Sequence, residues 1–136
     1  DICSPVATDP TWNKLDAADH AELKKDGGPL WHMLLEELKP QIVTVSVAKA
    51  HIEDITFTPL TSWRVIHTFR KKADGKRSAQ PYQIRGRWYD VGGKESLFIF
   101  ARAAYKPFGL LANIYKLEAG AMALDAYRGR SGLLLG

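Results

Sequence analysis

Apolar residues are concentrated in two short runs that predict buried strands. Residues 41–47 have the sequence QIVTVSV, and residues 95–101 have the sequence ESLFIFA. Short apolar runs rich in β-branched and aromatic residues are typical of strands covered on both faces, as in parallel sheets. We therefore expect the two strands to lie side by side and parallel in one sheet.

Helical spacing predicts three helices around these strands. The first begins at an acidic cap, Asp16 or Asp19, and ends before Gly27-Gly28, since glycines favour a helix terminus. The second covers residues 29–38 and the third covers residues 107–127, each with apolar side chains at intervals of three and four. From these helices and strands, the expected core consists of Leu34, Leu38, Val43, Val45, Leu97, Ile99, Leu111 and Ile114.

The segment between the two strands alternates apolar and polar residues and predicts an antiparallel hairpin. Alternation with a period of two runs through residues 62–72 and again through residues 81–91. Between them lies Asp74-Gly75, a strong signal for a tight hairpin turn. We expect either a β-hairpin or two extended arms over residues 62–91, with residues 73–80 mobile and exposed at the tip.

Together these elements predict an α/β domain with three layers, in which helices cover both faces of a central, largely parallel sheet. The hairpin would be a basic insertion at about residues 62–91. A chain of 136 residues with 46% apolar and 25% charged residues is long enough to bury one core. We therefore expect residues 1–136 to form one domain.

The chain lacks the motifs of several common enzyme and metal-binding classes. It contains no Walker-type phosphate loop, no GxGxxG and no GxSxG nucleophile elbow. Its single cysteine, Cys3, excludes an internal disulfide and a CxxC zinc site, and the four histidines are far apart in sequence. No cofactor and no metal site are therefore expected. The cysteine count suits a reducing compartment and no apolar run is long enough to cross a bilayer, so we expect a cytoplasmic location without a membrane partner.

Positive charge is concentrated in one short segment. The chain has a formal net charge of +4, and residues 70–77 hold five basic residues against one acid. A cluster of this length is most often a solvated loop, whereas on an exposed hairpin it also suits contact with phosphates. The candidate nucleic-acid contacts in this segment are Arg70, Lys71, Lys72, Lys76 and Arg77.

A second basic feature follows the strand at residues 95–101. Arg102 and Lys106 lie between the carboxyl end of that strand and the N-terminus of the next predicted helix. Ligands of α/β sheets bind beyond the carboxyl ends of strands, and a helix N-terminus adds free N–H groups and a positive dipole end. The two residues therefore form a candidate phosphate or anion site, the alternative being that they keep a surface loop soluble. The aromatic candidates to stack on an unpaired base are Trp88, Tyr105 and Phe108. The alternative for Trp88 and Phe108 is that they fill the core beneath the hairpin.

The order of segments along the chain suggests one family resemblance. An Asp-x-x-x-Pro-x-x-Thr loop at Asp1, Pro5 and Thr8 precedes the helix–strand unit GGPLWHMLLEELKP-QIVTVSV, and a strand, a loop and a helix end the chain. This order resembles the later two-thirds of the uracil-DNA glycosylase superfamily. The resemblance implies a DNA-binding α/β protein of DNA repair, a hydrolase that cleaves the N-glycosidic bond of a base without a cofactor. The family's first strand and water-activating loop would precede Asp1, which implies either the C-terminal portion of a longer enzyme or a divergent relative.

The resemblance also implies roles for individual residues. The family reads its base with an Asn at the position of Asp1, and an aspartate accepts hydrogen bonds but lacks the amide donor. The family's final loop carries a His that stabilises the departing base anion, where this chain has Arg102 and Lys106. Asp1, Arg102 and Lys106 are thus the catalytic candidates, with the two cations as electrostatic stabilisers of an anion.

Three hypotheses about function follow. The first is a glycosylase-like nucleic-acid domain, either a fragment of an enzyme or a divergent relative. The second is a non-catalytic module that binds nucleic acid through the basic hairpin and the loop at residues 102–109. The third is an α/β interaction or assembly module, which forms a homo-oligomer through the glycine-broken C-terminal tail RGRSGLLLG and the hairpin. Base release would favour the first, salt-sensitive DNA binding without base release the second, and a dimer indifferent to DNA the third.

Overall fold

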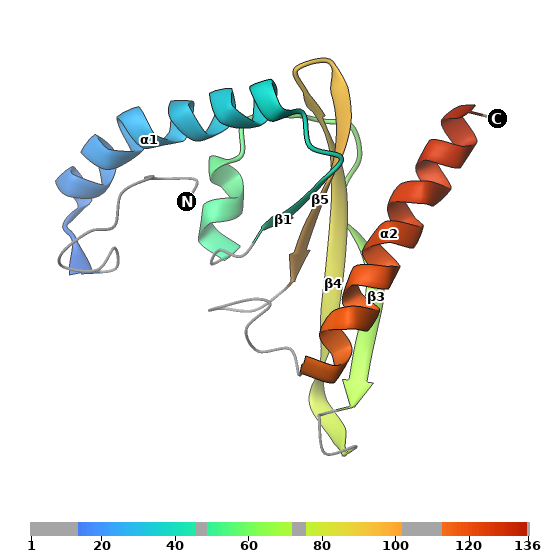
Figure 1. Cartoon of the computed structure of the whole chain (residues 1–136). Coiled ribbons are helices and arrows are strands. Elements are labelled where there is room, and N and C mark those ends of the chain that lie inside the picture. The colour runs from blue at the N-terminus through green and yellow to red at the C-terminus, as the bar shows by residue number, and fades with distance from the viewer. Residues whose placement is uncertain (1–13, 46–48, 72–75, 102–112, 136) are drawn as a thin grey trace.

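The computed structural model describes residues 14–45, 49–71, 76–101 and 113–135, which form a mixed α/β fold with a five-stranded sheet and two long helices (Figure 1). Along the chain the elements are α1 (Ala17–Leu38), β1 (Ile42–Val45), the short 3-10 helix η2 (Lys49–Asp54), β2 (Thr58–Pro59), β3 (Arg64–Lys71), β4 (Arg77–Val91), β5 (Lys94–Ala101) and α2 (Asn113–Leu135).

The sheet is mostly antiparallel, with one parallel pair at its edge. Its strands lie in the order β1-β5-β4-β2, and β3 also pairs with β4. β1 runs parallel to β5, with Ile42 opposite Leu97 and Val45 opposite Phe100, so the prediction of two adjacent parallel strands is confirmed. All other pairs are antiparallel, so this is not the largely parallel sheet that the sequence predicts.

A two-residue turn at Gly92-Gly93 explains this difference. Both glycines have positive φ, 58° and 87°, as the tight turns between antiparallel strands require. The N–H of Gly93 donates to Oδ1 of Asp90 at 2.8 Å, and a Cβ on Gly92 would lie 3.3 Å from the carbonyl oxygen of Glu36. β4 and β5 are therefore joined directly as a hairpin, and only the long crossover from β1 to β5 produces a parallel pair.

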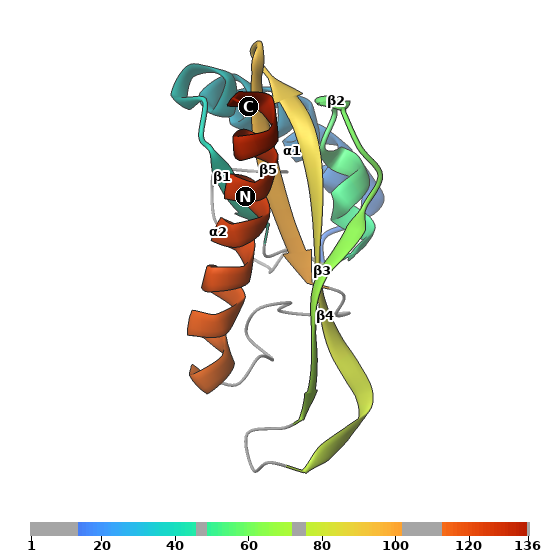
Figure 2. The same ribbon diagram turned by 90° about the vertical axis from the view of Figure 1, so that its right-hand side faces the viewer.

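The two faces of the sheet are covered differently (Figure 2). α2 lies along one face and packs on it through Ala119 and Ala123. The opposite face is covered by η2 and by Trp31 and Leu35 from one end of α1, while the other end of α1 extends away from the sheet (Figure 1). In the described part of the chain the second face thus carries one end of a helix and a short 3-10 turn, in place of the full helical layer that the sequence predicts.

α1 is one helix of 22 residues, whereas the sequence predicts two helices separated at Gly27-Gly28. Asp16 caps its start by accepting a hydrogen bond from the N–H of Asp19 at 2.8 Å. Its end is closed by Lys39 in the left-handed conformation. Pro29 lies inside the helix, where its ring removes one N–H donor and crowds the preceding turn. Contacts of the following turn with the rest of the protein must therefore support the helix there.

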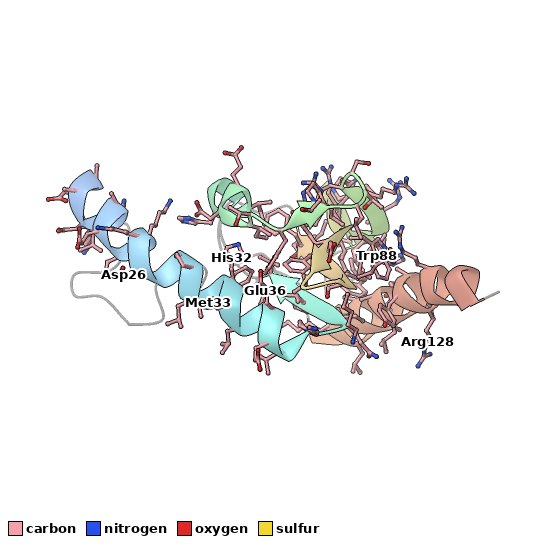
Figure 3. All side chains as sticks on the ribbon, turned by 90° about the horizontal axis from the view of Figure 1, so that it is seen from above. Asp26, His32, Met33, Glu36, Trp88 and Arg128 are labelled. Atoms are coloured by element: carbon pink, nitrogen blue, oxygen red, sulfur yellow. The ribbon has the colours of Figure 1, made fainter. Side chains whose placement is uncertain are left out.

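His32 supplies such contacts one turn after the proline. Its Nε2 accepts a hydrogen bond from the N–H of Thr56 at 2.9 Å, so Nδ1 carries the ring hydrogen and donates it to the carbonyl oxygen of Gly28 at 2.7 Å. The ring centroid also lies 4.7 Å from that of Phe57. In Figure 3, His32 points toward η2 and Met33 points to the opposite side of α1. These contacts hold α1 to the segment after η2 and offset the disturbance at the proline.

Both long helices bury a different face from the one that their leucine spacing predicts. Leu34 and Leu38 of α1 are 55% and 67% exposed, and Leu117 of α2 is 86% exposed. The face of α1 that meets the sheet and η2 carries Trp31 and Leu35 instead, and the face of α2 carries alanines and tyrosines. The expected core positions Val45, Leu97 and Ile99 are buried, Val43 is half-buried, and Leu111 and Ile114 lie outside the described side chains.

α2 is longer than its predicted end at residue 127. It continues to Leu135 through the segment that the sequence predicts as a broken tail. A glycine inside a helix costs only about 1 kcal/mol, which tertiary contacts can offset. Arg130 makes such contacts, since its Nε donates to Oε2 of Glu95 at 3.1 Å and its guanidinium carbon lies 4.9 Å from the ring centroid of Trp88.

Tyr82 offers a pH-dependent test of the packing beneath α2. Its hydroxyl is buried and has no hydrogen-bond partner among the described residues, and burial raises its pKa from 10.0 to about 12. The folded state holds this proton more tightly than the unfolded state, so the associated stability is complete below pH 10 and is lost as the pH rises toward 12.

Tyr82→Phe removes the phenol hydroxyl, which is the group that titrates and which has no hydrogen-bond partner among the described residues. We expect it to raise the free energy of unfolding by about 1 kcal/mol at neutral pH and to reduce the loss of stability between pH 10 and 12. Urea unfolding of both proteins across this range measures the difference. Equal losses in the two proteins would contradict the burial of this hydroxyl.

Candidate nucleic-acid interface

β3 and β4 form a long antiparallel hairpin that projects beyond the rest of the sheet (Figures 1 and 2). The register pairs Phe69 with Tyr82 and Lys71 with Arg77, which confirms the predicted antiparallel pairing. β4 already begins at Arg77, so the later part of the predicted loop at residues 73–80 is strand. The earlier part of that loop, up to residue 75, lies outside the described residues.

The hairpin segment carries the whole positive excess of the chain. Residues 64–91 contain eight basic residues and two acids, whereas the remaining residues contain eleven basic residues and thirteen acids. The charge is therefore segregated along the sequence. The structure places Arg70, Lys71, Lys76 and Arg77 at the projecting end of the hairpin, whereas Arg64, Arg85 and Arg87 lie where the strands pair within the sheet. A positive field of this kind attracts polyanions.

The predicted phosphate contacts are brought together at the far end of the hairpin. Arg70 and Lys76 are exposed, and Lys71 and Arg77 are backbone partners where the two strands end. Lys72, the remaining candidate of this cluster, lies outside the described residues.

The second predicted site, which follows β5, also lies outside the described residues. It comprises the candidates Arg102, Tyr105, Lys106 and Phe108, and the separate catalytic candidate Asp1 lies outside the described residues as well. The structure describes β5 as far as Ala101, which is buried and pairs with Ile84 of β4. The roles expected for the residues beyond this strand therefore stay predictions.

Trp88, the third aromatic candidate for base stacking, is a core residue. Its side chain is 9% exposed and belongs to the cluster beneath α2. The ring stacks on Tyr127 with the centroids 5.5 Å apart, and the guanidinium carbon of Arg130 lies 4.9 Å from its centroid. Tyr127 and Arg130 thus cover the Trp88 ring, and the alternative prediction, that Trp88 fills the core, is confirmed.

A pocket with a volume of about 370 Å³ opens on the face of the sheet opposite α2. It lies between η2, residues 55–63 and the adjacent parts of β4 and β5. The Trp63 ring lies edge-on to Tyr89 and Phe100, at centroid distances of 6.4 and 6.0 Å. Phe57 also lines the pocket. A mostly apolar and aromatic lining with a few polar groups is typical of small-ligand sites.

Two arginines of β4 supply the polar groups. Arg85 and Arg87 are two residues apart on the strand, so both side chains leave it on the pocket face. Nε of Arg87 donates to the carbonyl oxygen of Thr61 at 2.8 Å, and its guanidinium carbon lies 5.3 Å from the Tyr89 ring centroid. Nη2 of Arg85 donates to Oε1 of Gln83 at 3.0 Å, while its buried Nε has no hydrogen-bond partner among the described residues.

Positive charge in the pocket is not balanced by carboxylates. Within the described segments, neither Arg85 nor Arg87 forms an ion pair with an acidic side chain. Glu53 lines the pocket but is itself exposed. Burial raises the pKa of Tyr89 and Arg87 partly opposes this shift, so the Tyr89 hydroxyl is neutral at physiological pH. The pocket lining therefore combines two guanidinium groups, the exposed carboxylate of Glu53 and neutral aromatic rings.

The sequence prediction includes neither Arg85 nor Arg87 among the site residues. A signal for them exists in the alternation of the stretch QIRGRWY, which places both arginines and Tyr89 on one face of a strand. The alternation does not show that η2 and residues 55–63 close over that face. That closure depends on contacts between segments far apart in the sequence.

Within the four described segments, no group of three or more His, Cys, Asp or Glu side chains is placed to hold a metal ion. None of the described helices combines the length and the hydropathy needed to cross a bilayer. No family model, curated protein or solved structure matches this chain. Its function is therefore inferred from the chemistry of the hairpin and of the pocket.

Proposed function

We propose that this chain binds nucleic acid and that the β3–β4 hairpin makes the main contact. The observation that carries the proposal is the position of Arg70, Lys71, Lys76 and Arg77 at the end of a hairpin that projects beyond the sheet (Figure 2). Exposed Arg70 and Lys76 supply long, cationic side chains at its far end. Contacts between such side chains and phosphates provide nearly all of the affinity of non-specific nucleic-acid binding.

The shape of the hairpin supports this contact. A two-stranded β-ribbon fits the major groove of B-DNA, which is about 12 Å wide. Strand residues advance by about 3.3 Å each. The basic residues of the hairpin are distributed over both strands, from Arg64 and Arg70 on β3 to Arg77 on β4. The hairpin can therefore reach several phosphates at once, either along a groove or along a single strand.

Base excision, which the family resemblance implies, is the narrower form of the proposal. Its support is the resemblance in sequence order, and its catalytic candidates are Asp1, Arg102 and Lys106. A glycosylase would hydrolyse the N-glycosidic bond of a uracil-containing oligonucleotide and release the free base, which chromatography detects. DNA binding without base release would assign the chain to the non-catalytic class.

Binding to duplex DNA is expected to depend steeply on salt. If the hairpin contacts about four phosphates, the logarithm of the association constant should fall with the logarithm of the salt concentration with a slope near −4. The affinity should then decrease by about 10²-fold between ~50 and ~200 mM salt. Fluorescence anisotropy of a labelled duplex of arbitrary sequence measures this. Undetectable binding at the low-salt end, or an affinity independent of salt, would refute the proposal.

A second candidate function, assembly through apolar helix faces, is favoured by the exposed leucines. Leu34 and Leu38 of α1, and Leu117 and Leu124 of α2, are exposed. Clustered exposed apolar side chains often mark contacts with other proteins. The contact predicted through the C-terminal tail involves side chains outside those described. Sedimentation velocity with and without duplex DNA separates the two candidates, because a concentration-dependent dimer that ignores DNA would support assembly alone.

A further inference from the structure

The pocket beside Arg85 and Arg87 contains donors that the protein itself does not satisfy. Burying a charged group is unfavourable unless the group is paired and hydrogen-bonded. Both guanidinium groups are half-buried, and their hydrogen-bond acceptors among the described residues are neutral: Oε1 of Gln83 and the carbonyl oxygen of Thr61. Glu53 also lines the pocket but forms no ion pair with either arginine within the described segments. The buried Nε of Arg85 has no hydrogen-bond partner within the described residues. An anion in the pocket would satisfy these donors, and the forked guanidinium geometry suits carboxylate or phosphate oxygens.

The rest of the lining suits a planar ring. Trp63 and Phe100 both line the pocket, with their ring centroids 6.0 Å apart, and Tyr89 adds a neutral phenol. Aromatic side chains of this kind stack on planar groups whatever their hydrogen-bonding pattern. The volume of about 370 Å³ is near the lower end of small-molecule sites. It suits one ring system that carries one anionic group.

We propose that this pocket binds a planar ring bearing an anionic group, which is the chemistry of a nucleotide. The phosphate meets Arg85 and Arg87, and the base lies against Trp63 and Phe100. The choice of a nucleotide rests on the proposed nucleic-acid function, whereas the combination of ring and anion rests on the pocket alone. A free mononucleotide and one unstacked nucleotide of a single strand present the same chemistry, and the experiment below separates these two sources.

Calorimetric titration of the full chain with adenosine 5′-monophosphate and uridine 5′-monophosphate tests the proposal. Both nucleotides are expected to bind, and adenosine, which lacks the anion, and inorganic phosphate, which lacks the ring, should each bind at least about tenfold more weakly. Arg85→Gln and Arg87→Gln should each weaken nucleotide binding by about tenfold, the effect of losing one charge-assisted hydrogen bond. Arg128→Gln removes the same charge from an exposed residue of α2 that points away from the sheet (Figure 3), so it should leave the affinity unchanged.

A ring variant gives an independent readout. Trp63→Leu should weaken nucleotide binding while leaving the weak affinity for inorganic phosphate unchanged, because both arginines remain. Trp63→Phe, which keeps an aromatic ring, should restore most of the nucleotide affinity. Thermal unfolding of each variant shows that it is folded before titration. Absence of nucleotide binding to the unmodified chain, or equal affinities in the unmodified chain and both arginine variants, would overturn the proposal.

Competition distinguishes the two sources of the nucleotide. If a short oligothymidylate displaces a fluorescent mononucleotide from the protein, the ligand is a nucleotide of a single strand. If the mononucleotide binds and the oligothymidylate does not displace it, the ligand is the free nucleotide. The failure of this inference is separable from that of the proposed function. If duplex binding by the hairpin persists while nucleotides do not bind, only the pocket proposal is lost. If nucleotides bind while duplex DNA does not, only the hairpin proposal is lost.

Discussion

Replacing Phe98 with alanine is expected to lower the free energy of unfolding by about 3–5 kcal/mol. Phe98 is 0% exposed in the middle of β5, and its ring centroid lies 4.6 Å from that of Tyr89 and 6.2 Å from that of Phe57. The backbone of Phe98 pairs with Val43 on one side and with Arg87 on the other. Because close-packed sheet neighbours relax only partly, the missing ring leaves a cavity. The loss is a large share of the ~5–15 kcal/mol that stabilises a domain.

Urea unfolding measures this effect against a matched control. Leu117→Ala also truncates a large apolar side chain, but that side chain is 86% exposed on α2. Its free energy of unfolding should change by no more than about 0.5 kcal/mol. A cost below about 1 kcal/mol for Phe98→Ala, or equal costs at the two positions, would show that β5 is not at the centre of the core.

The second large effect is expected from neutralising the end of the hairpin. We define the hairpin-neutral variant as the chain in which Arg70, Lys71, Lys76 and Arg77 are all replaced by glutamine. Each cation that neutralises one phosphate contributes about 0.9 to the salt slope, which at ~0.1 M salt corresponds to nearly tenfold in affinity. The variant should therefore bind duplex DNA about 10³–10⁴-fold more weakly than the unmodified chain. Its fold should persist, because the substitutions leave the apolar core intact.

A control variant separates this contact from a general effect of net charge. Replacing Lys14, Lys25, Lys116 and Arg128 with glutamine removes the same number of positive charges from exposed positions outside the hairpin. Its DNA affinity should stay within about threefold of the unmodified chain, because interactions with distant exposed charges are screened by salt. An equal loss of affinity in both variants would show that net charge, rather than the hairpin, controls binding.

The strands are the part of this fold that the sequence predicts best, because their signals are local. The apolar runs at residues 41–47 and 95–101 and the alternation around Asp74-Gly75 correspond to β1, β5 and the β3–β4 hairpin. The direction of β4 relative to β5 is harder to predict. The sequence Gly92-Gly93 is compatible with either a loop that separates the two strands or a tight turn that joins them as a hairpin. Only the positive φ angles of the two glycines show that it is the turn.

The buried faces of the helices could not be predicted from spacing alone. In α1 the leucines at 30, 34 and 38 form one apolar stripe, while Trp31 and Leu35 form a neighbouring one. Either stripe satisfies the helical period, so the choice depends on the partner surface. The sheet and η2 select Trp31 and Leu35, which leaves the longer leucine stripe exposed.

The basic end of the hairpin and the pocket also differ in how well the sequence predicts them. The basic end of the hairpin is predicted from composition and from one turn signal, both of which are local. The pocket requires residues 52–63 to fold over Arg85, Arg87 and Phe100. No spacing pattern relates segments so far apart in the sequence. In the sequence, Arg85 and Arg87 are therefore visible only as two basic residues on one face of an alternating strand.

The salt slope of duplex binding shows whether the hairpin contacts phosphates. The measurement compares the association constants of the unmodified chain and the hairpin-neutral variant between ~50 and ~200 mM salt. We expect the slope of the variant to be shallower by about three to four units, since four contacts contribute about 0.9 each. Equal slopes for the two proteins would contradict the phosphate contact, whatever their affinities.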